Sequence, residues 1–169
     1  GAIAIPAKSF DDLTDYTVSA WVQLSAFPTE LGSIFTKSDS LDTPGVSLLL
    51  APDGSLIWLA PDTSTDPLFS TDPLLKVGEA AMVTVMSTGN GDNVSVSVNG
   101  ALAGSGQGLG EVAADPGVFY IGSFGPLFTF GLADDLQIYA KAFSAEEIKQ
   151  LADNPGTVLV PEQPDSDGS

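Results

Sequence analysis

The 169-residue sequence contains no cysteine, no histidine and no arginine. Without cysteine the chain can form no disulfide and no thiolate metal site, and it has no cysteine nucleophile. Without histidine it lacks the commonest general base and transition-metal ligand. These absences exclude Ser-His-Asp and Cys-His catalysis and ordinary zinc sites.

Positive charge is also scarce. Five basic residues face 22 acidic ones, which gives a net charge of −17 at pH 7. A polyanion such as DNA, RNA or heparin would be repelled, because its binding depends on basic side chains that release counterions. Nucleic acid is therefore not expected as a partner. The excess acid favours divalent cations or a salty medium; alternatively, it only provides solubility.

No apolar run is long enough to span a bilayer and no signal peptide is recognisable, so we expect no membrane insertion. Composition divides the chain into a domain at residues 1–158 and an acidic Pro/Ser/Asp tail at residues 159–169. A tail of this kind is typical of an interdomain linker. We therefore expect a module that is joined to other domains of its parent chain.

Short strands with period-two patterning account for most of the chain. In Tyr16–Leu24, alternate residues place Val18, Ala20 and Val22 on one face and Trp21 on the other. Two hairpins are predicted. The first turns at Asp53-Gly54 and the second turns at residues 89–93. Antiparallel strands with one apolar face must pack sheet on sheet, so the pattern predicts an all-β sandwich.

Two further segments differ from this pattern. Gly104–Gly110 is rich in glycine but has no following helix and no lysine, so we expect a flexible loop rather than a phosphate site. Ser144 followed by Glu147 is a capping box, and it predicts a short helix that ends at Asn154-Pro155-Gly156.

Several segments in the right order resemble one family. They are Asp15–Val22, Ile34–Lys37, Val94–Gly100, Tyr120–Gly122, Phe130–Tyr139 and Ala142–Ile148. Together, over residues 10–153, they resemble the laminin-G-like jelly-roll family of concanavalin A-like domains. The resemblance implies a two-sheet antiparallel jelly-roll sandwich with one short C-terminal helix, in a secreted or cell-surface protein. The sequence departs from the family at Glu79-Ala80-Ala81, where a tryptophan is usual, and at Gln137.

The resemblance also implies a calcium ion, with Asp135 as its ligand and Asp134 beside it. Ca²⁺ takes six to eight oxygen ligands, which a strand carboxylate and backbone carbonyls can supply without histidine or cysteine. The alternative is that one aspartate caps a loop N–H while the other is solvated.

Sugar recognition needs planar polar groups and an apolar platform. Candidate polar groups lie in acidic or amide-rich turns at Asp39, Asp42, Asp92 and Asn93, and Trp58 is the candidate platform because it lies opposite Ile57 and Leu59 on its strand. The alternative is that Asp, Asn and Gly occur in these turns for backbone reasons.

Glucanases with this fold carry a Glu-x-Asp-x-(x-)Glu run on one strand, and this sequence has none. We therefore expect a non-catalytic, calcium-stabilised recognition module that binds a glycan or a cell-surface glycoconjugate within a larger adhesin or secreted enzyme. The alternative is a structural spacer or a protein–protein interaction domain of a surface protein. An enzyme with scattered carboxylates is the third option.

Overall fold

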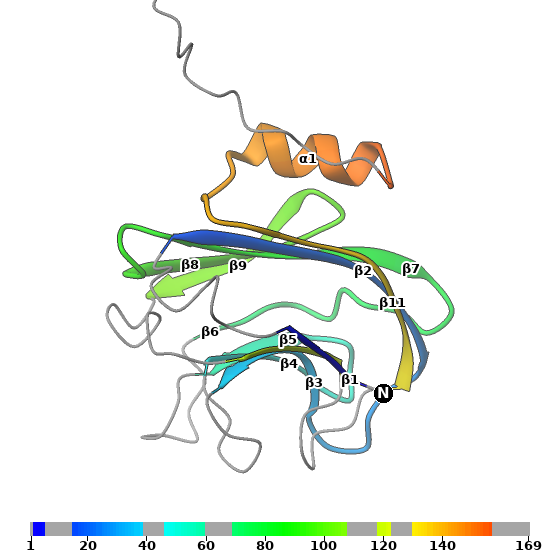
Figure 1. Ribbon diagram of the computed structural model, residues 1–169. Helices are drawn as coiled ribbons and strands as arrows, with labels where there is room; N and C mark the ends of the chain where they lie inside the picture. Colours follow the sequence, from blue (N-terminus) through cyan, green and yellow to red (C-terminus); the bar gives the residue numbers. More distant parts are fainter. Residues whose placement is uncertain are drawn as a thin grey trace, which may run out of the picture.

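Two antiparallel sheets pack face to face, and one helix lies outside them (Figure 1). This computed structural model describes residues 2–5, 15–38, 46–59, 69–107, 118–122 and 130–156. The six-stranded sheet has the order β1-β10-β3-β4-β5-β6 and the five-stranded sheet the order β11-β2-β7-β8-β9. Every named pair of strands is antiparallel. The predicted jelly-roll sandwich with one C-terminal helix is confirmed.

The strands of the six-stranded sheet are β1 (Ala2–Ile5), β3 (Gly32–Ser38), β4 (Val46–Leu50), β5 (Leu56–Leu59), β6 (Phe69–Ser70) and β10 (Val118–Gly122). The strands of the five-stranded sheet are β2 (Tyr16–Ala26), β7 (Ala80–Thr88), β8 (Asn93–Val98), β9 (Ala101–Gln107) and β11 (Phe130–Tyr139). The helix α1 spans Ala145–Asp153. No helix in this described part of the chain is long and apolar enough to cross a membrane.

The main core lies between the two sheets. Alternate residues of β2 face it, as the period-two pattern predicts, and the facing strands β4 and β5 contribute Leu48, Leu56 and Trp58. Tyr16 is also fully buried, and burial raises the pKa of its phenol well above the usual range because the interior disfavours the charged form. The core therefore consists of the inward rows of two half-apolar sheets.

A second apolar cluster lies on the outer face of the five-stranded sheet, beneath α1. Met82 from β7 packs there with Phe143, Ile148 and Leu151, and Trp21 packs at its edge. In Figure 1 the five-stranded sheet lies between this helix and the six-stranded sheet. Both faces of the sheet are therefore apolar where α1 covers it.

Thr17 holds the chain that leads into α1. Its hydroxyl donates to the Lys141 carbonyl at 2.7 Å and accepts the Phe143 N–H at 3.0 Å. Because Thr17 is fully buried, this polar side chain needs both partners. The approach of the helix to the sheet is thus fixed from β2.

Two expectations from the sequence are wrong. Trp58 is fully buried and faces the core with Leu56, while its neighbours Ile57 and Leu59 are half-buried on the other face. Gly104–Gln107, expected in a flexible loop, belongs to the edge strand β9. A Cβ at residue 104 would come within 3.1 Å of the Phe69 ring, so glycine is what lets β9 approach β6 closely. Residues 108–110 of that expected loop lie outside the described residues.

Candidate functional site

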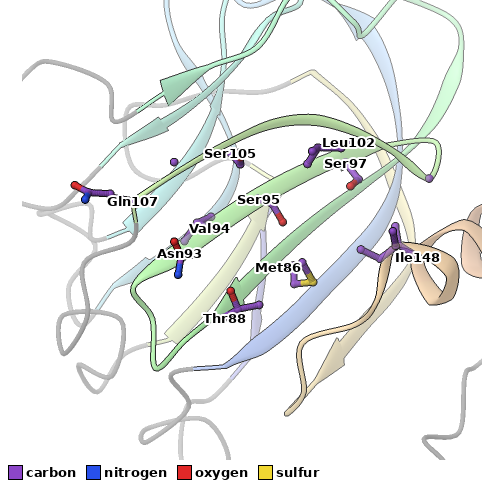
Figure 2. Close-up of a pocket in the computed structure, with 13 residues that line it drawn as sticks. Met86, Thr88, Asn93, Val94, Ser95, Ser97, Leu102, Ser105, Gln107 and Ile148 are labelled. Atoms are coloured by element: carbon purple, nitrogen blue, oxygen red, sulfur yellow. The ribbon is translucent and has the colours of Figure 1, made fainter.

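A groove lies on the outer face of the five-stranded sheet, where α1 stops covering it. It has a volume of about 620 Å³, within the range of small-ligand sites. Figure 2 shows its side chains on neighbouring strands, with Ile148 of α1 at one end and Asn93 and Gln107 toward the other. Its lining residues are Met86, Thr88, Asn93, Val94, Ser95, Ser97, Gly100, Leu102, Ser105, Gly106, Gln107, Ala145 and Ile148.

The floor of the groove is built from residues that lie opposite one another on β7, β8 and β9. Because paired residues in adjacent strands face the same side of a sheet, each row presents its side chains together. The rows are Thr88, Asn93 and Gln107; Met86, Ser95 and Ser105; and, on β8 and β9 alone, Ser97 and Leu102.

A β-bulge in β9 determines the last of these rows. The register shifts between Val96, which pairs with Gly104, and Ser97, which pairs with Leu102. The extra residue, Ala103, packs partly against the main core. The shift leaves Leu102 68% exposed, on the groove side. The groove thereby gains an apolar side chain on its outer strand.

The turn between β8 and β9 supports α1 at the end of the groove. Asn99 and Gly100 have φ values of +51° and +83°, which suit a tight Asn-Gly hairpin turn. The Asn99 Oδ1 accepts the Met82 N–H at 2.9 Å. A Cβ at Gly100 would lie 3.1 Å from the Lys149 Cα and from the Ala152 Cβ. The helix therefore lies directly on this turn, and a side chain at position 100 would be both conformationally strained and tightly packed against it.

The first turn of α1 is held by the predicted capping box, which is confirmed. The Ser144 Oγ accepts the Glu147 N–H at 3.2 Å, and the Glu147 carboxylate accepts the Ser144 N–H at 3.1 Å. The Ser144 N–H and, secondarily, the Lys141 ammonium hold the pKa of Glu147 below its usual value. Two of the N–H groups left free at a helix start are satisfied in this way.

Chemically, the groove-lining residues that the structure describes are uncharged. Its hydroxyl and amide groups come from Thr88, Asn93, Ser95, Ser97, Ser105 and Gln107. Within the described chain none of these side chains makes a hydrogen bond, so their donors and acceptors are available to a ligand. Met86, Leu102 and Ile148 add apolar contact surface. Hydroxyl pairs and a small apolar face can both be recognised here.

The predicted calcium residues lie elsewhere, at a bulge in β11. The Asp135 Oδ2 accepts the Gly156 N–H at 3.0 Å and its Oδ1 accepts the Gln137 side-chain amide at 3.0 Å. The Asp134 Oδ1 accepts the Asp135 N–H at 2.8 Å. Asp135 therefore ties the turn that follows α1 to β11.

Each Asp135 carboxylate oxygen already accepts one hydrogen bond. A carboxylate oxygen has two lone pairs, so the Asp135 oxygens retain acceptor capacity. Among the described residues, however, no three acidic side chains gather around one point. Backbone carbonyls would have to supply most of the remaining ligands, so calcium at Asp135 and Asp134 stays a prediction.

The other predicted ligand residues are dispersed. Asn93 lines the groove, and Asp92 precedes it in the exposed turn between β7 and β8. Asp39 and Asp42 lie outside the described residues. The buried Trp58 cannot stack on a sugar, so its predicted role is wrong. Among the predicted ligand residues that the structure describes, Asn93 alone lines the groove.

The sequence reading missed the other groove residues. Alternation in β8 does indicate that Ser95 and Ser97 face away from the core. It does not show which residues of β7 and β9 lie beside them, because that depends on strand register and on the bulge at Ala103.

Solved structures share this fold. Trypanosoma rangeli sialidase in complex with the inhibitor DANA is 17% identical, with a TM-score of 0.69 over 90% of this chain. The chain spans only 26% of that sialidase. A heptameric SAP-like pentraxin from Limulus polyphemus is 18% identical, with a TM-score of 0.62 over 83% of this chain and 70% of the pentraxin.

Domain 4 of AbnA, an extracellular arabinanase from Geobacillus stearothermophilus, was solved in complex with arabinotriose. It is 23% identical, with a TM-score of 0.67 over 89% of this chain and 72% of that domain. No curated protein is significantly similar in sequence. The model of the family described as the concanavalin A-like lectin/glucanases superfamily matches residues 1–149. The chain belongs to this laminin-G-like, concanavalin A-like family.

Proposed function

We propose that this chain is a non-catalytic carbohydrate-recognition module and that its ligand binds in the groove beside α1. The observation that carries the proposal is the groove lining. Six side chains there offer uncommitted hydroxyl or amide groups, and Met86 and Leu102 lie among them. A sugar ring presents the complementary surface, with hydroxyls around its edge and C–H groups on its face.

The similarity to domain 4 of the arabinanase supports the class of ligand. That domain was solved with arabinotriose and shares the fold of this chain. Its function as one domain of a larger extracellular enzyme also fits the proposal that this module is secreted and serves a longer parent protein. Arabinotriose is therefore the first probe to test.

The same lining supports a non-catalytic role. Glycoside hydrolysis needs a pair of carboxyl groups on either side of the scissile bond. No aspartate or glutamate lines the groove, as far as the described residues go. Recognition without bond cleavage is what such a surface can perform. Calcium, if bound through Asp135 and Asp134, would add an oxygen-coordinated crosslink at β11, away from the groove lining.

A glycan array followed by calorimetry with arabinotriose tests the proposal. We compare the wild type with Ser95→Gln, which places a longer neutral side chain on the groove floor. The matched control is Ser25→Gln, because Ser25 is exposed on β2 and lies outside the groove. We expect at least one glycan to bind the wild type and the control equally, and Ser95→Gln to weaken that binding by about tenfold or more.

Circular dichroism and thermal unfolding verify that both variants fold. If no glycan on a broad array binds the wild type, the proposal is wrong. If a glycan binds but the two variants behave alike, the glycan lies elsewhere and the groove is not the site.

A further inference from the structure

We infer that the groove selects uncharged glycans and discriminates against acidic sugars such as sialic acid and uronic acids. This inference rests on the proposed function and defines the ligand class of the same site. It follows from three features of charge around the groove.

The first feature is the absence of a positive side chain in the lining. Recognition of a sugar carboxylate uses an arginine or lysine, or a set of backbone N–H groups. The sequence has no arginine, and no lysine that the structure describes lines the groove. Lys149, next to Ile148 on α1, is the cation nearest in sequence to the lining.

The second feature is the start of α1, where Ala145 lines the groove. A helix N-terminus can attract an anion through its free N–H groups and its dipole. Here the capping box already uses two of these N–H groups. The Ser144 hydroxyl accepts the Glu147 N–H, and the Glu147 carboxylate accepts the Ser144 N–H. Glu146 and Glu147 also add negative charge in the first turn. The capping box satisfies two of the N–H groups, and the two carboxylates offset the positive end of the helix dipole, so this helix start attracts an incoming carboxylate less than an uncapped, uncharged one would.

The third feature is the negative charge of two residues that adjoin the groove lining in sequence. Asp92 immediately precedes the lining residue Asn93, and Glu146 immediately follows Ala145. Both side chains are exposed, on a chain with a net charge of −17. A carboxylate brought into the groove is repelled by these groups and by the overall field, while a neutral sugar is unaffected.

An array of matched glycan pairs tests this selectivity. Each pair contains a neutral oligosaccharide and the same oligosaccharide with one added sialic or uronic acid, and arabinotriose is included as a further neutral probe. Binding is measured at about 0.01 M and about 1 M salt, where the Debye length is about 30 Å and about 3 Å. We expect the acidic member of each bound pair to bind about fivefold or more weakly at low salt, and this penalty to shrink at high salt.

The double variant Asp92→Asn with Glu146→Gln identifies the origin of the penalty, because neither residue lines the groove. At low salt it should reduce the difference in affinity between the neutral and acidic members of each pair. Its affinity for neutral glycans should equal that of the wild type. Equal or tighter binding of acidic glycans by the wild type overturns the inference, even if Ser95→Gln still shows that the groove is the site. Absence of any glycan binding overturns both the inference and the proposed function.

Discussion

Replacement of Gly100 by alanine measures how closely α1 rests on the turn that ends the groove. The backbone at Gly100 has φ +83°, and a Cβ there would lie 3.1 Å from the Lys149 Cα and the Ala152 Cβ. Alanine in a left-handed conformation costs about 1–2 kcal/mol. Overpacking against the helix costs about 1–3 kcal/mol more. Gly100→Ala should therefore lower the free energy of unfolding by about 2–5 kcal/mol.

Gly78→Ala is the matched control. Gly78 has nearly the same backbone angle, φ +81°, but nothing lies within 4 Å of its Cβ position. The conformational cost and the change in the unfolded chain are then shared by both variants. The difference between them, about 1–3 kcal/mol, is the contact with α1 alone.

Urea denaturation followed by tryptophan fluorescence gives both values, because Trp58 reports on the main core and Trp21 on the cluster beneath α1. For a chain of this size the expected difference corresponds to a melting temperature about 2–12 °C lower for Gly100→Ala than for Gly78→Ala. Equal destabilisation by the two substitutions would refute the reasoning, since α1 would then not lie on the turn.

The remaining predictions concern the two ends of α1. Ser144→Ala should lower the free energy of unfolding by about 1 kcal/mol, as measured by urea denaturation, and an unchanged value would argue against the capping box. The pKa of Glu147 is lowered in the folded protein, so the ionised carboxylate stabilises the fold above its unfolded pKa, and this stabilisation is lost as the pH falls through the folded pKa. The wild type should therefore have a higher free energy of unfolding than Glu147→Gln at neutral pH, and the two values should converge in acid. At the other end, Asp135→Ala removes the acceptor of the exposed Gly156 N–H and should lower the free energy of unfolding by about 0.5–1.5 kcal/mol in EDTA. If calcium binds there, excess Ca²⁺ raises the melting temperature of the wild type but not of Asp135→Ala, and no shift in the wild type would end the calcium hypothesis.

Local sequence signals were sufficient for most of the fold. Alternation in β2 correctly separated Val18 and Val22, which face the core, from Trp21, which packs beneath α1. The Ser144 and Glu147 pair correctly located the helix start, since a capping box depends only on residues three apart. Both signals involve residues a few positions apart, so local propensity and periodicity are enough to predict the local structure.

Signals that depend on distant contacts were not readable. Period two relates neighbouring residues to each other but does not say which face is buried, so Trp58 was assigned to the wrong one. Gly104 of β9 is typical of a loop in the sequence alone, because its packing against the Phe69 ring depends on a residue far away in the chain. The groove itself needs the register of β7, β8 and β9 and the bulge at Ala103, which no single segment encodes.

Nuclear magnetic resonance titration of the labelled protein with a neutral glycan, arabinotriose first and then the strongest array binder, tests the central claim most directly. The groove account predicts that amide shifts concentrate in β7, β8, β9 and the first turn of α1, with Ser95 and Ser105 among the residues affected. It also predicts that the same shifts need about tenfold or more higher glycan concentration in Ser95→Gln. Saturable shifts confined to other parts of the molecule, such as β11 around Leu132, with the groove amides unmoved, would contradict it.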